Sequence, residues 1–323
     1  MVARAGLTGV VADRITVRLP EDGSDESLVA WLSLRLGQPI RVALSASPPR
    51  ANRKPVLHLI ADDGTTLGFA KVGHNTLTRR LVDAEARVLS RLGTRPSPGL
   101  RVPQVILHDQ WGGMDVLVQE PLIRRGASRG SPVSVVQTMS AFARRDGLHV
   151  SDLEASPYIR RLGRRIVAIT DDPQIRAVFA RELAEVVSSD GGKPLSLGLS
   201  HGDFTPWNYA QDGDGLIVWD WERFASDVPL GFDALHLAFQ GAVTRGRVPA
   251  ALAARQLFAR SQDLLEPFGA DHSTAEATAV LYLLDIGVRY STDGQRLMRA
   301  PLADVEDWLL PALAARRSTA AAG

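Results

Sequence analysis

The residues best suited to chemistry in this 323-residue sequence are concentrated between positions 201 and 222. Asp203 and Asn208 are five residues apart, and Pro206 between them favours a loop over a regular helix. A carboxylate and an amide side chain on one loop can act on the same bound molecule. This loop is therefore the first candidate for an active site.

A second carboxylate is expected beside that loop. The apolar run from Leu216 to Trp219 predicts a buried strand that ends at Asp220. Turn residues from Asp212 to Gly215 predict a hairpin that returns Asp220 to the side of Asn208. Carboxylate and amide oxygens are ligands that Mg²⁺ prefers, and a further carboxylate can accept the proton of an attacking hydroxyl. Phosphoryl transfer needs this set of groups.

The H-G-D-x-x-x-x-N loop from His201 to Asn208, together with the strand ending in Asp220-Trp221-Glu222, resembles the aminoglycoside phosphotransferase and choline kinase-like family. That family shares the protein-kinase fold. Gly202 stands where protein kinases have arginine, and Asp-Trp-Glu replaces D-F-G, which favours the small-molecule branch. The resemblance implies that Asp203 is the catalytic base, that Asn208 and Asp220 are Mg²⁺ ligands, and that the cofactors are ATP (or another nucleoside triphosphate) and Mg²⁺.

Other interpretations of these residues stay open. The aspartates could instead cap backbone N–H groups at a turn and a strand end, although two such motifs together disfavour this. His201 is expected to brace the loop by hydrogen bonds, and Asp233 resembles the family aspartate that braces it from the next helix. Glu222 could contact the metal through water or simply close the strand.

The same hypothesis requires a phosphate-binding lysine upstream and a glutamate that holds it. Lysine occurs only at Lys54, Lys71 and Lys193, whereas the other 34 of the 37 basic residues are arginine. Lys71 falls on the third predicted strand, and Glu85 falls within the helix after it. We expect both to contribute to nucleotide binding; the alternative for Glu85 is a solvated carboxylate on the helix surface.

The nucleotide loop and the hinge are less clearly marked. The segment from Leu44 to Pro55 contains no glycine, so the expected phosphate contacts are serine hydroxyls, backbone N–H groups and Arg50 or Arg53. The serines are Ser45 and Ser47. Residues 119–122 are expected to form a hinge that reaches the adenine ring, with a plain linker between lobes as the alternative. The hinge residues assigned to the cofactor are Gln119, Glu120 and Leu122.

The predicted elements form two lobes. The first, over residues 1–120, has the order strand, strand, strand, helix, strand, strand, at 40–44, 56–60, 67–72, 77–92, 102–107 and 114–118. The second, over 121–323, is mainly helical, with helices from Ser131-Pro132 to about 145, from Asp172-Pro173 onward, and near 250–265, 273–290 and 303–315. The predicted fold class is α+β: a two-lobed protein-kinase-like fold with a small mixed lobe around an antiparallel sheet and a larger helical lobe.

Composition excludes several function classes. The formal net charge is +1, which argues against a nucleic-acid partner, and there are no cysteines, which excludes thiolate chemistry. No run is long or apolar enough for a membrane span or a signal peptide, so we expect a soluble cytoplasmic protein without a membrane partner. The sequence does not determine the oligomeric state.

The expected acceptor is a small hydroxylated molecule: a sugar, amino sugar, amino alcohol or aminoglycoside-like compound. From Arg223 to the end there are 11 acidic and 10 basic residues, which gives no acidic surplus to attract a polycation. The cluster Arg160, Arg161, Arg164 and Arg165 is expected to be a solvated helix face, with an anionic acceptor as the alternative. A protein kinase and a non-catalytic nucleotide-binding module remain as rival functions.

Overall fold

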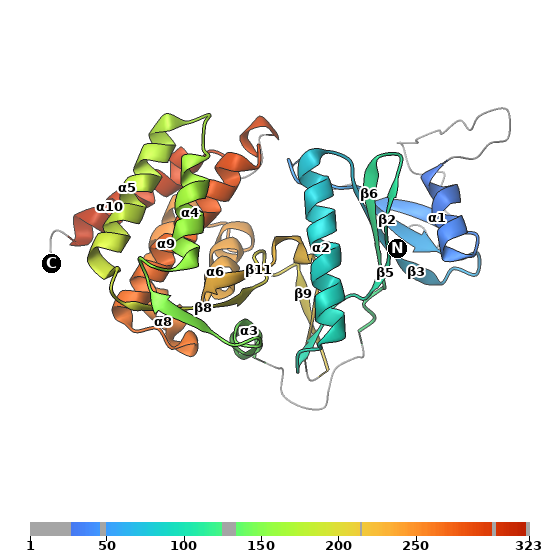
Figure 1. Cartoon of the computed structure of the whole chain (residues 1–323), viewed down its shortest axis with the longest axis horizontal. Coiled ribbons are helices and arrows are strands. Elements are labelled where there is room, and N and C mark those ends of the chain that lie inside the picture. Colours follow the sequence, from blue (N-terminus) through green and yellow to red (C-terminus); the bar gives the residue numbers. More distant parts are fainter. Residues whose placement is uncertain (1–26, 46–49, 125–133, 214, 299–301, 321–323) are drawn as a thin grey trace.

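The computed structural model describes residues 27–45, 50–124, 134–213, 215–298 and 302–320 (Figure 1). These residues form a sheet-containing lobe and a helical lobe. Helix α2 lies between the sheet and the helical lobe (Figure 1).

The small lobe is built on a five-stranded antiparallel sheet with the order β1-β2-β3-β6-β5. Its strands are β1 (Arg41–Ser45), β2 (Val56–Ile60), β3 (Thr66–Gly73), β5 (Val105–Trp111) and β6 (Met114–Gln119). Successive side chains along the central strands point to opposite faces of the sheet. Ala70 and Val118 face one apolar cluster, while Lys71 and its cross-strand partner Leu117 face the other side.

Two helices cover these faces. Helix α1 (Leu28–Leu36) packs against the face that holds Ala70, where Leu32 and Leu59 are fully buried. Helix α2 (Thr76–Thr94) covers the opposite face and starts with a capping box between Asn75 and Thr78. The apolar face of α2 packs into the core of the helical lobe and comprises Val82, Ala86, Leu89 and Leu92.

The large lobe is mainly helical. Its helices are α3 (Val135–Ala143), α4 (Pro157–Val167), α5 (Pro173–Asp190), α6 (Phe232–Thr244), α7 (Ala250–Ala259), α8 (Ser261–Leu265), α9 (His272–Thr292) and α10 (Val305–Ala320). Short 3₁₀ turns are η3 (Trp221–Arg223), η4 (Glu266–Phe268) and η5 (Arg296–Met298). Helix α9 runs through the centre of this lobe and is buried along most of its length, from Ala275 to Val288.

Two small sheets flank the polar segment, and the first of them has strands from both lobes. One has the order β4-β10-β9, from β4 (Leu100–Arg101), β9 (Tyr209–Asp212) and β10 (Gly215–Val218). The other has the order β11-β8-β7, from β7 (His149–Asp152), β8 (Pro194–Ser200) and β11 (Ala225–Pro229). The loop from His201 to Asn208 therefore runs from the end of β8 to the start of β9.

The sequence predictions agree with most of this architecture and miss part of it. The five strands of the small sheet, the helix over 77–92 and the hairpin at 212–215 are confirmed within a few residues. Helix α1 and the β11-β8-β7 sheet were not predicted. The third helix begins after the cap Ser134, not at Ser131-Pro132, which lie outside the described residues.

None of the helices among the described residues is both long and apolar enough to cross a membrane.

Candidate active site

Lys71 is the most tightly paired cation of the site. Its Nζ lies 2.7 Å from both carboxylate oxygens of Glu85 and 2.7 Å from Oδ1 of Asp220. Strand β3 supplies the lysine, α2 the glutamate and the end of β10 the aspartate. Both members of the predicted Lys71–Glu85 pair are buried, so Glu85 is not a solvated carboxylate on the helix surface.

Charge determines the protonation of this cluster. Burial alone would lower the pKa of Lys71, but the carboxylates of Asp220 and Glu85 outweigh it and raise that pKa above its ordinary value. Burial would raise the pKa of Asp220, yet the ammonium groups of Lys71 and Lys54 hold it below its ordinary value. Lys71 is therefore a cation and Asp220 an anion at neutral pH.

The loop that carries Asp203 is fixed by its neighbours. Asp233, at the start of α6, accepts hydrogen bonds from the backbone N–H groups of His201 (2.7 Å) and Gly202 (2.9 Å) and from the Ser200 hydroxyl (2.9 Å). His201 bonds the Trp219 carbonyl through Nε2 at 3.0 Å and accepts from the backbone N–H of Asp203 at 3.2 Å. Both residues brace the loop, as the sequence predicted.

Asp203 itself is held by two side chains that the sequence analysis missed. His236 Nε2 lies 3.1 Å from Oδ1 of Asp203, and an Arg289 nitrogen lies 3.8 Å from the same oxygen. Burial alone would raise the pKa of Asp203, but the hydrogen bond from His236 and the charge of Arg289 outweigh it and place that pKa well below its ordinary value. Asp203 is therefore a carboxylate at neutral pH.

A signal for the two missed residues exists in the sequence. His236 follows Asp233 by one helical turn, so both point to the same side of α6. Arg289 and Asp285 are the only charged residues between Ala277 and Thr292, within an otherwise apolar helix. A charged residue inside a buried helix needs a polar partner, and the partner of Arg289 is Asp203.

Asn208 joins the loop to the strand that bears Asp220. Its amide nitrogen donates to the Asp203 carbonyl (2.9 Å) and to Asp203 Oδ2 (3.2 Å). Its backbone carbonyl accepts from the N–H of Trp219, the residue before Asp220. Because the amide nitrogen faces Asp203, the side-chain oxygen is the atom that Asn208 can offer to a cation.

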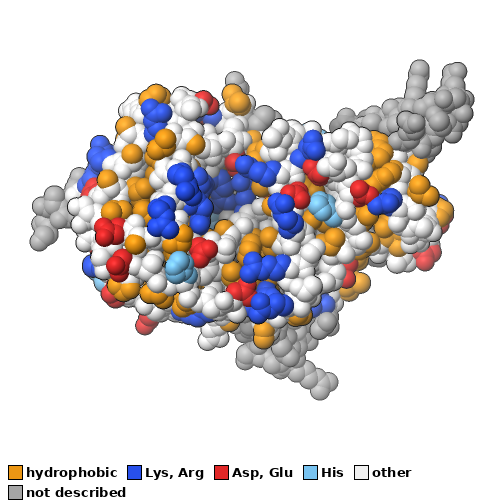
Figure 2. Space-filling view, in the orientation of Figure 1, with side chains coloured by type: hydrophobic (Ala, Val, Ile, Leu, Met, Phe, Trp, Pro, Cys, Tyr) orange, Lys and Arg blue, Asp and Glu red, His pale blue; other side chains and the backbone are white. Residues whose placement is uncertain are grey.

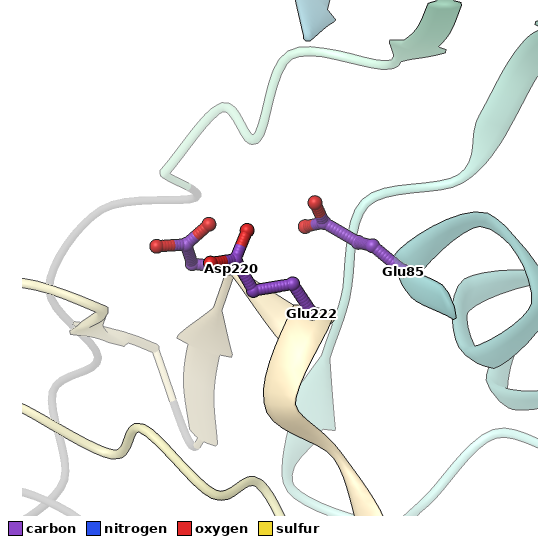
Figure 3. Close-up of side chains that lie close together, drawn as sticks. All are labelled: Glu85, Asp220 and Glu222. Atoms are coloured by element: carbon purple, nitrogen blue, oxygen red, sulfur yellow. The ribbon is translucent and has the colours of Figure 1, made fainter. Parts of the chain in front are cut away.

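Asp220 has an unusual backbone. Its φ is 70°, in the left-handed region, where η3 begins directly after β10. Aspartate and asparagine tolerate this region better than most residues. The change of direction at this position starts η3, which brings Glu222 into the same cluster as Asp220 and Glu85 (Figure 3).

The residues of this cluster fit a divalent cation. One carboxylate oxygen each of Glu85, Asp220 and Glu222 lies within 4.8 Å of the others (Figure 3). Glu85 is committed to Lys71 and the Trp221 backbone N–H, and Glu222 to Lys54 and the Asn52 amide, which leaves Asp220 and Asn208 as the oxygen donors. Hard oxygen ligands suit Mg²⁺, and three carboxylates against the ammonium groups of Lys71 and Lys54 leave a negative charge to be balanced.

Lys54 is a further residue that the sequence analysis did not assign. It forms an ion pair with Glu222, and both side chains are largely buried. Burial and the charge of Asp220 raise the pKa of Glu222 above its ordinary value. The same loop reaches the large lobe elsewhere, because Gln295 accepts from the Ala51 backbone N–H at 3.2 Å. Residues 50–54 therefore cross from the small lobe to the large one beside the candidate site.

The structure locates only some of the other residues that the sequence assigned to the cofactor. Ser45 ends β1, and Ser47 lies outside the described residues. Gln119 is buried at the end of β6. Glu120 and Leu122 line a cavity of about 260 Å³ with Leu92 of α2. The structure does not bring the Glu120 and Leu122 side chains to the Lys71 cluster, so their assignment to the nucleotide stays a prediction.

A second cavity, of about 160 Å³, opens in front of Asp203. It lies between the loop of residues 50–52, α6 and the end of α9, and Trp207 and Tyr290 contribute aromatic surface to it. Arg50, Arg223 and Arg289 line it together with Asp203 and Asp293. We refer to this cavity as the acceptor cleft.

Comparison with known proteins supports the fold. No protein-family model and no curated protein matches the sequence. A thermostable mutant of aminoglycoside phosphotransferase APH(4)-Ia is 18% identical, with a TM-score of 0.57 over 91% of this chain and 99% of that chain. A candidate fructosamine-3-kinase from Haemophilus somnus is 16% identical, with a TM-score of 0.53 over 86% of this chain and 97% of that one. The chain therefore has the two-lobed protein-kinase-like fold that these small-molecule kinases share.

Proposed function

We propose that this protein is a phosphotransferase that moves the γ-phosphoryl group of ATP, or another nucleoside triphosphate, to a hydroxyl of a small molecule with the help of Mg²⁺. The observation that carries this proposal is the bond of Lys71 to Glu85 and Asp220, from three separate elements, beside a fixed Asp203–Asn208 loop. The fold alone does not require these side chains to meet. Their meeting is what phosphoryl transfer needs.

Each residue has a definite task in this reaction. Lys71, held by Glu85, positions the phosphates, and Asp203 orients the acceptor hydroxyl and accepts its proton. The acceptor oxygen forms the new bond to phosphorus while the bond to the bridging oxygen of the nucleotide breaks. Asn208 and Asp220 would hold Mg²⁺, which when bound neutralises charge on the phosphates.

The acceptor cleft favours a hydroxylated molecule that is not a polycation. Three arginines face two aspartates there, so the cleft has no acidic surplus. Its aromatic and amide side chains, such as Trp207, Tyr290 and Gln240, suit a sugar ring. The similar APH(4)-Ia is known with AMP-PNP and hygromycin B, and the other similar protein is named a fructosamine-3-kinase. A sugar, amino sugar or amino alcohol is the proposed acceptor.

A specific observation disfavours a protein kinase. Only residues 221–231 separate Asp220 from the start of α6, and most of them belong to η3 and β11. This leaves no room for a long segment that could bind a peptide or be switched by phosphorylation. A non-catalytic nucleotide-binding module is disfavoured because Asp203, which nucleotide binding does not require, is fixed and ionised.

The test is nucleotide consumption with a panel of sugars, amino sugars, amino alcohols and aminoglycosides. We expect Mg²⁺-dependent turnover with a subset of them. Asp203→Asn, which keeps the shape of the side chain, should lower kcat by about 10²–10⁴-fold while nucleotide affinity is retained. Tight Mg·ATP binding without turnover of any acceptor would instead support a binding module, and transfer to proteins would support a protein kinase.

A further inference from the structure

A third cavity lies on the far side of Arg223 and Arg289 from the acceptor cleft. Its volume is about 190 Å³, several times what one water molecule needs. It is enclosed by α4, β11, the start of α6 and α9, behind the loop that carries Asp203. Lys and Arg side chains gather around a hollow near the centre of the molecule (Figure 2). We call this cavity the arginine cavity.

The arginine run on α4 divides between this cavity and solvent. Arg161 and Arg165 are four residues apart, half-buried, and line the cavity. Arg160 and Arg164, also four residues apart, are exposed. The prediction that all four belong to a solvated helix face is therefore wrong for Arg161 and Arg165, because the helical repeat turns that pair toward α9.

The bonds of the four cavity arginines leave much of their donor capacity for a ligand. Arg161 donates to the Asp227 carbonyl (2.8 Å), Arg165 to Asp285 (2.8 Å) and Arg289 to the Gly202 carbonyl (2.8 Å). Arg289 Nε is buried and has no hydrogen-bond partner among the described residues. Each guanidinium carries five N–H donors in a planar fork that suits carboxylate and phosphate oxygens.

Guanidinium groups outnumber carboxylates in the lining of the cavity, although Asp293 and Asp203 face Arg223 and Arg289 from outside it. Four guanidinium groups line it against two carboxylates, those of Asp233 and Asp285. Asp233 is occupied by the loop N–H groups, and Asp285 by Arg165 and the Tyr158 hydroxyl. Asp293 pairs with Arg223 at 2.5 Å from the side of the acceptor cleft. Like charges gathered in a partly enclosed space are favoured when an anion lies between them.

We propose that the arginine cavity binds the phosphate or carboxylate group of a small molecule, with Arg161 and Arg165 as its binding residues. Arg223 and Arg289 line both this cavity and the acceptor cleft, so a bound anion lies next to Arg289 and His236, which hold Asp203. The anion is either the acid group of the acceptor or a separate effector. The binding itself does not rest on the proposed function, whereas the choice between these two sources does.

The first experiment measures binding of inorganic phosphate without turnover. By calorimetry and by the rise in Tm, at constant ionic strength, we expect the wild-type protein to bind phosphate. The double variant Arg161→Gln/Arg165→Gln should weaken that binding at least about tenfold, since each charge-assisted bond contributes substantially. The matched control Arg160→Gln/Arg164→Gln, on the exposed face of the same helix, should bind as the wild type does.

Two further variants keep this test decisive. Lys71→Met should retain phosphate binding, which separates the arginine cavity from the nucleotide site. Arg161→Gln alone removes bonds to two backbone carbonyls and a contact with the Tyr158 ring, but no ion pair among the described residues, and serves if the double variant fails to fold. Absence of phosphate binding by the wild type, or equal loss in the control pair, would overturn the proposal.

The source of the anion is decided by kinetics with paired acceptors, for example a sugar and its acidic derivative. If the acceptor supplies the anion, Arg161→Gln/Arg165→Gln raises KM for the acidic acceptor about tenfold or more and leaves the neutral one unchanged. If the anion is an effector, added phosphate changes kcat with the neutral acceptor in the wild type and not in the variant. If neither KM for the acidic acceptor nor the response of kcat to phosphate changes in the variant, the cavity only binds ions. That result would contradict a role for the bound anion in the reaction.

Discussion

Two of the three lysines, Lys54 and Lys71, form ion pairs with buried carboxylates of the candidate site. A lysine ammonium is a compact charge, so Lys71 can approach Glu85 and Asp220 at the same 2.7 Å. A guanidinium is planar and longer, and it cannot contact carboxylates on two sides of a buried point in the same way. This difference explains why a chain rich in arginine keeps lysine here.

A first prediction follows for Lys71→Arg. The charge is preserved but the position is lost, so we expect kcat/KM for the nucleotide to fall about 10²–10³-fold, almost as far as in Lys71→Met. Steady-state kinetics of both variants provide the measurement. Near-wild-type activity of Lys71→Arg would show that charge alone is sufficient. As a control, Lys193→Arg changes an exposed lysine distant from the site and should have no effect.

A second prediction concerns the pH dependence set by His236. Burial lowers the pKa of His236, so the ring is neutral, with Nδ1 accepting from the Tyr282 hydroxyl and Nε2–H donating to Asp203. In His236→Phe the hydrogen bond is lost while burial remains. The pKa of Asp203 therefore rises, by about one to two units for a bond to a charged group.

Because a raised pKa leaves less carboxylate at low pH, the kcat of His236→Phe relative to wild type should fall as pH is lowered from about 5 to about 3, where a carboxyl near its ordinary pKa titrates, and should stay constant between about 5 and 7. His236→Gln places an amide N–H near the position of Nε2 and should restore much of the loss. A ratio of kcat values that does not change with pH would contradict this role for His236.

At the scale of elements, the turn at Gly202 is fixed by close backbone contact. Its φ is +80°, and a Cβ there would lie 2.1 Å from the Arg223 carbonyl oxygen. That contact holds the loop bearing Asp203 against the segment that follows Asp220. No side chain can be accommodated, which gives a physical reason for glycine at the position where protein kinases have arginine.

The third prediction is that Gly202→Ala destabilises the protein by at least ~2 kcal/mol, from the left-handed backbone and the forced displacement of Arg223. Gly192→Ala is the matched control, because nothing lies near its Cβ and its φ is not positive. We expect that control to stay within about 0.5 kcal/mol of wild type. Denaturant unfolding measures both, and similar free energies of unfolding for the two variants would disprove the packing argument.

Elements differ in how far the sequence determined them. The strands at 56–60 and 67–72 and the helix over 77–92 were predictable because each has a clear period and a turn or cap at its end. Helix α1 is apolar except for Ser33 and Arg35, so its pattern does not distinguish a buried face from an exposed one. The sheet of β7, β8 and β11 joins short strands distant in the chain, one of them partly exposed, and such pairing leaves little local pattern.

The candidate site was predictable where residues belong to a motif and not where they meet only in space. Asp203, Asn208, Asp220, Lys71 and Glu85 stand at motif spacing. His236, Arg289 and Lys54 approach the site through the packing of α6, α9 and the 50–54 loop, and the weak signals for His236 and Arg289 do not identify Asp203 as their partner. The helical pairing of Arg161 with Arg165 was visible in the sequence, but the side to which it points depends on α9.

At the scale of the whole molecule, the predicted lobe boundary at residue 120 does not separate the two apolar clusters of the core. The apolar face of α2 belongs to the same buried cluster as Trp221, Phe142 and much of the helical lobe. The rest of the small lobe keeps a separate cluster between its sheet and α1. Helix α2 thus joins the two lobes through a large apolar contact, which opposes independent motion or unfolding of either.

The last prediction is that the lobes unfold together. Leu59, in the sheet cluster, and Leu89, in the shared cluster, are both fully buried, so Leu→Ala at either position should cost about 2–5 kcal/mol. Because α2 couples the clusters, calorimetry should show one transition in each variant, moved to lower Tm, with calorimetric and van't Hoff enthalpies that agree. Leu297→Ala, at an exposed position, is the control. If Leu59→Ala instead produced an early separate transition while the main one stayed in place, the small lobe would be an independent unit, and α2 would not be the element that binds the lobes into one.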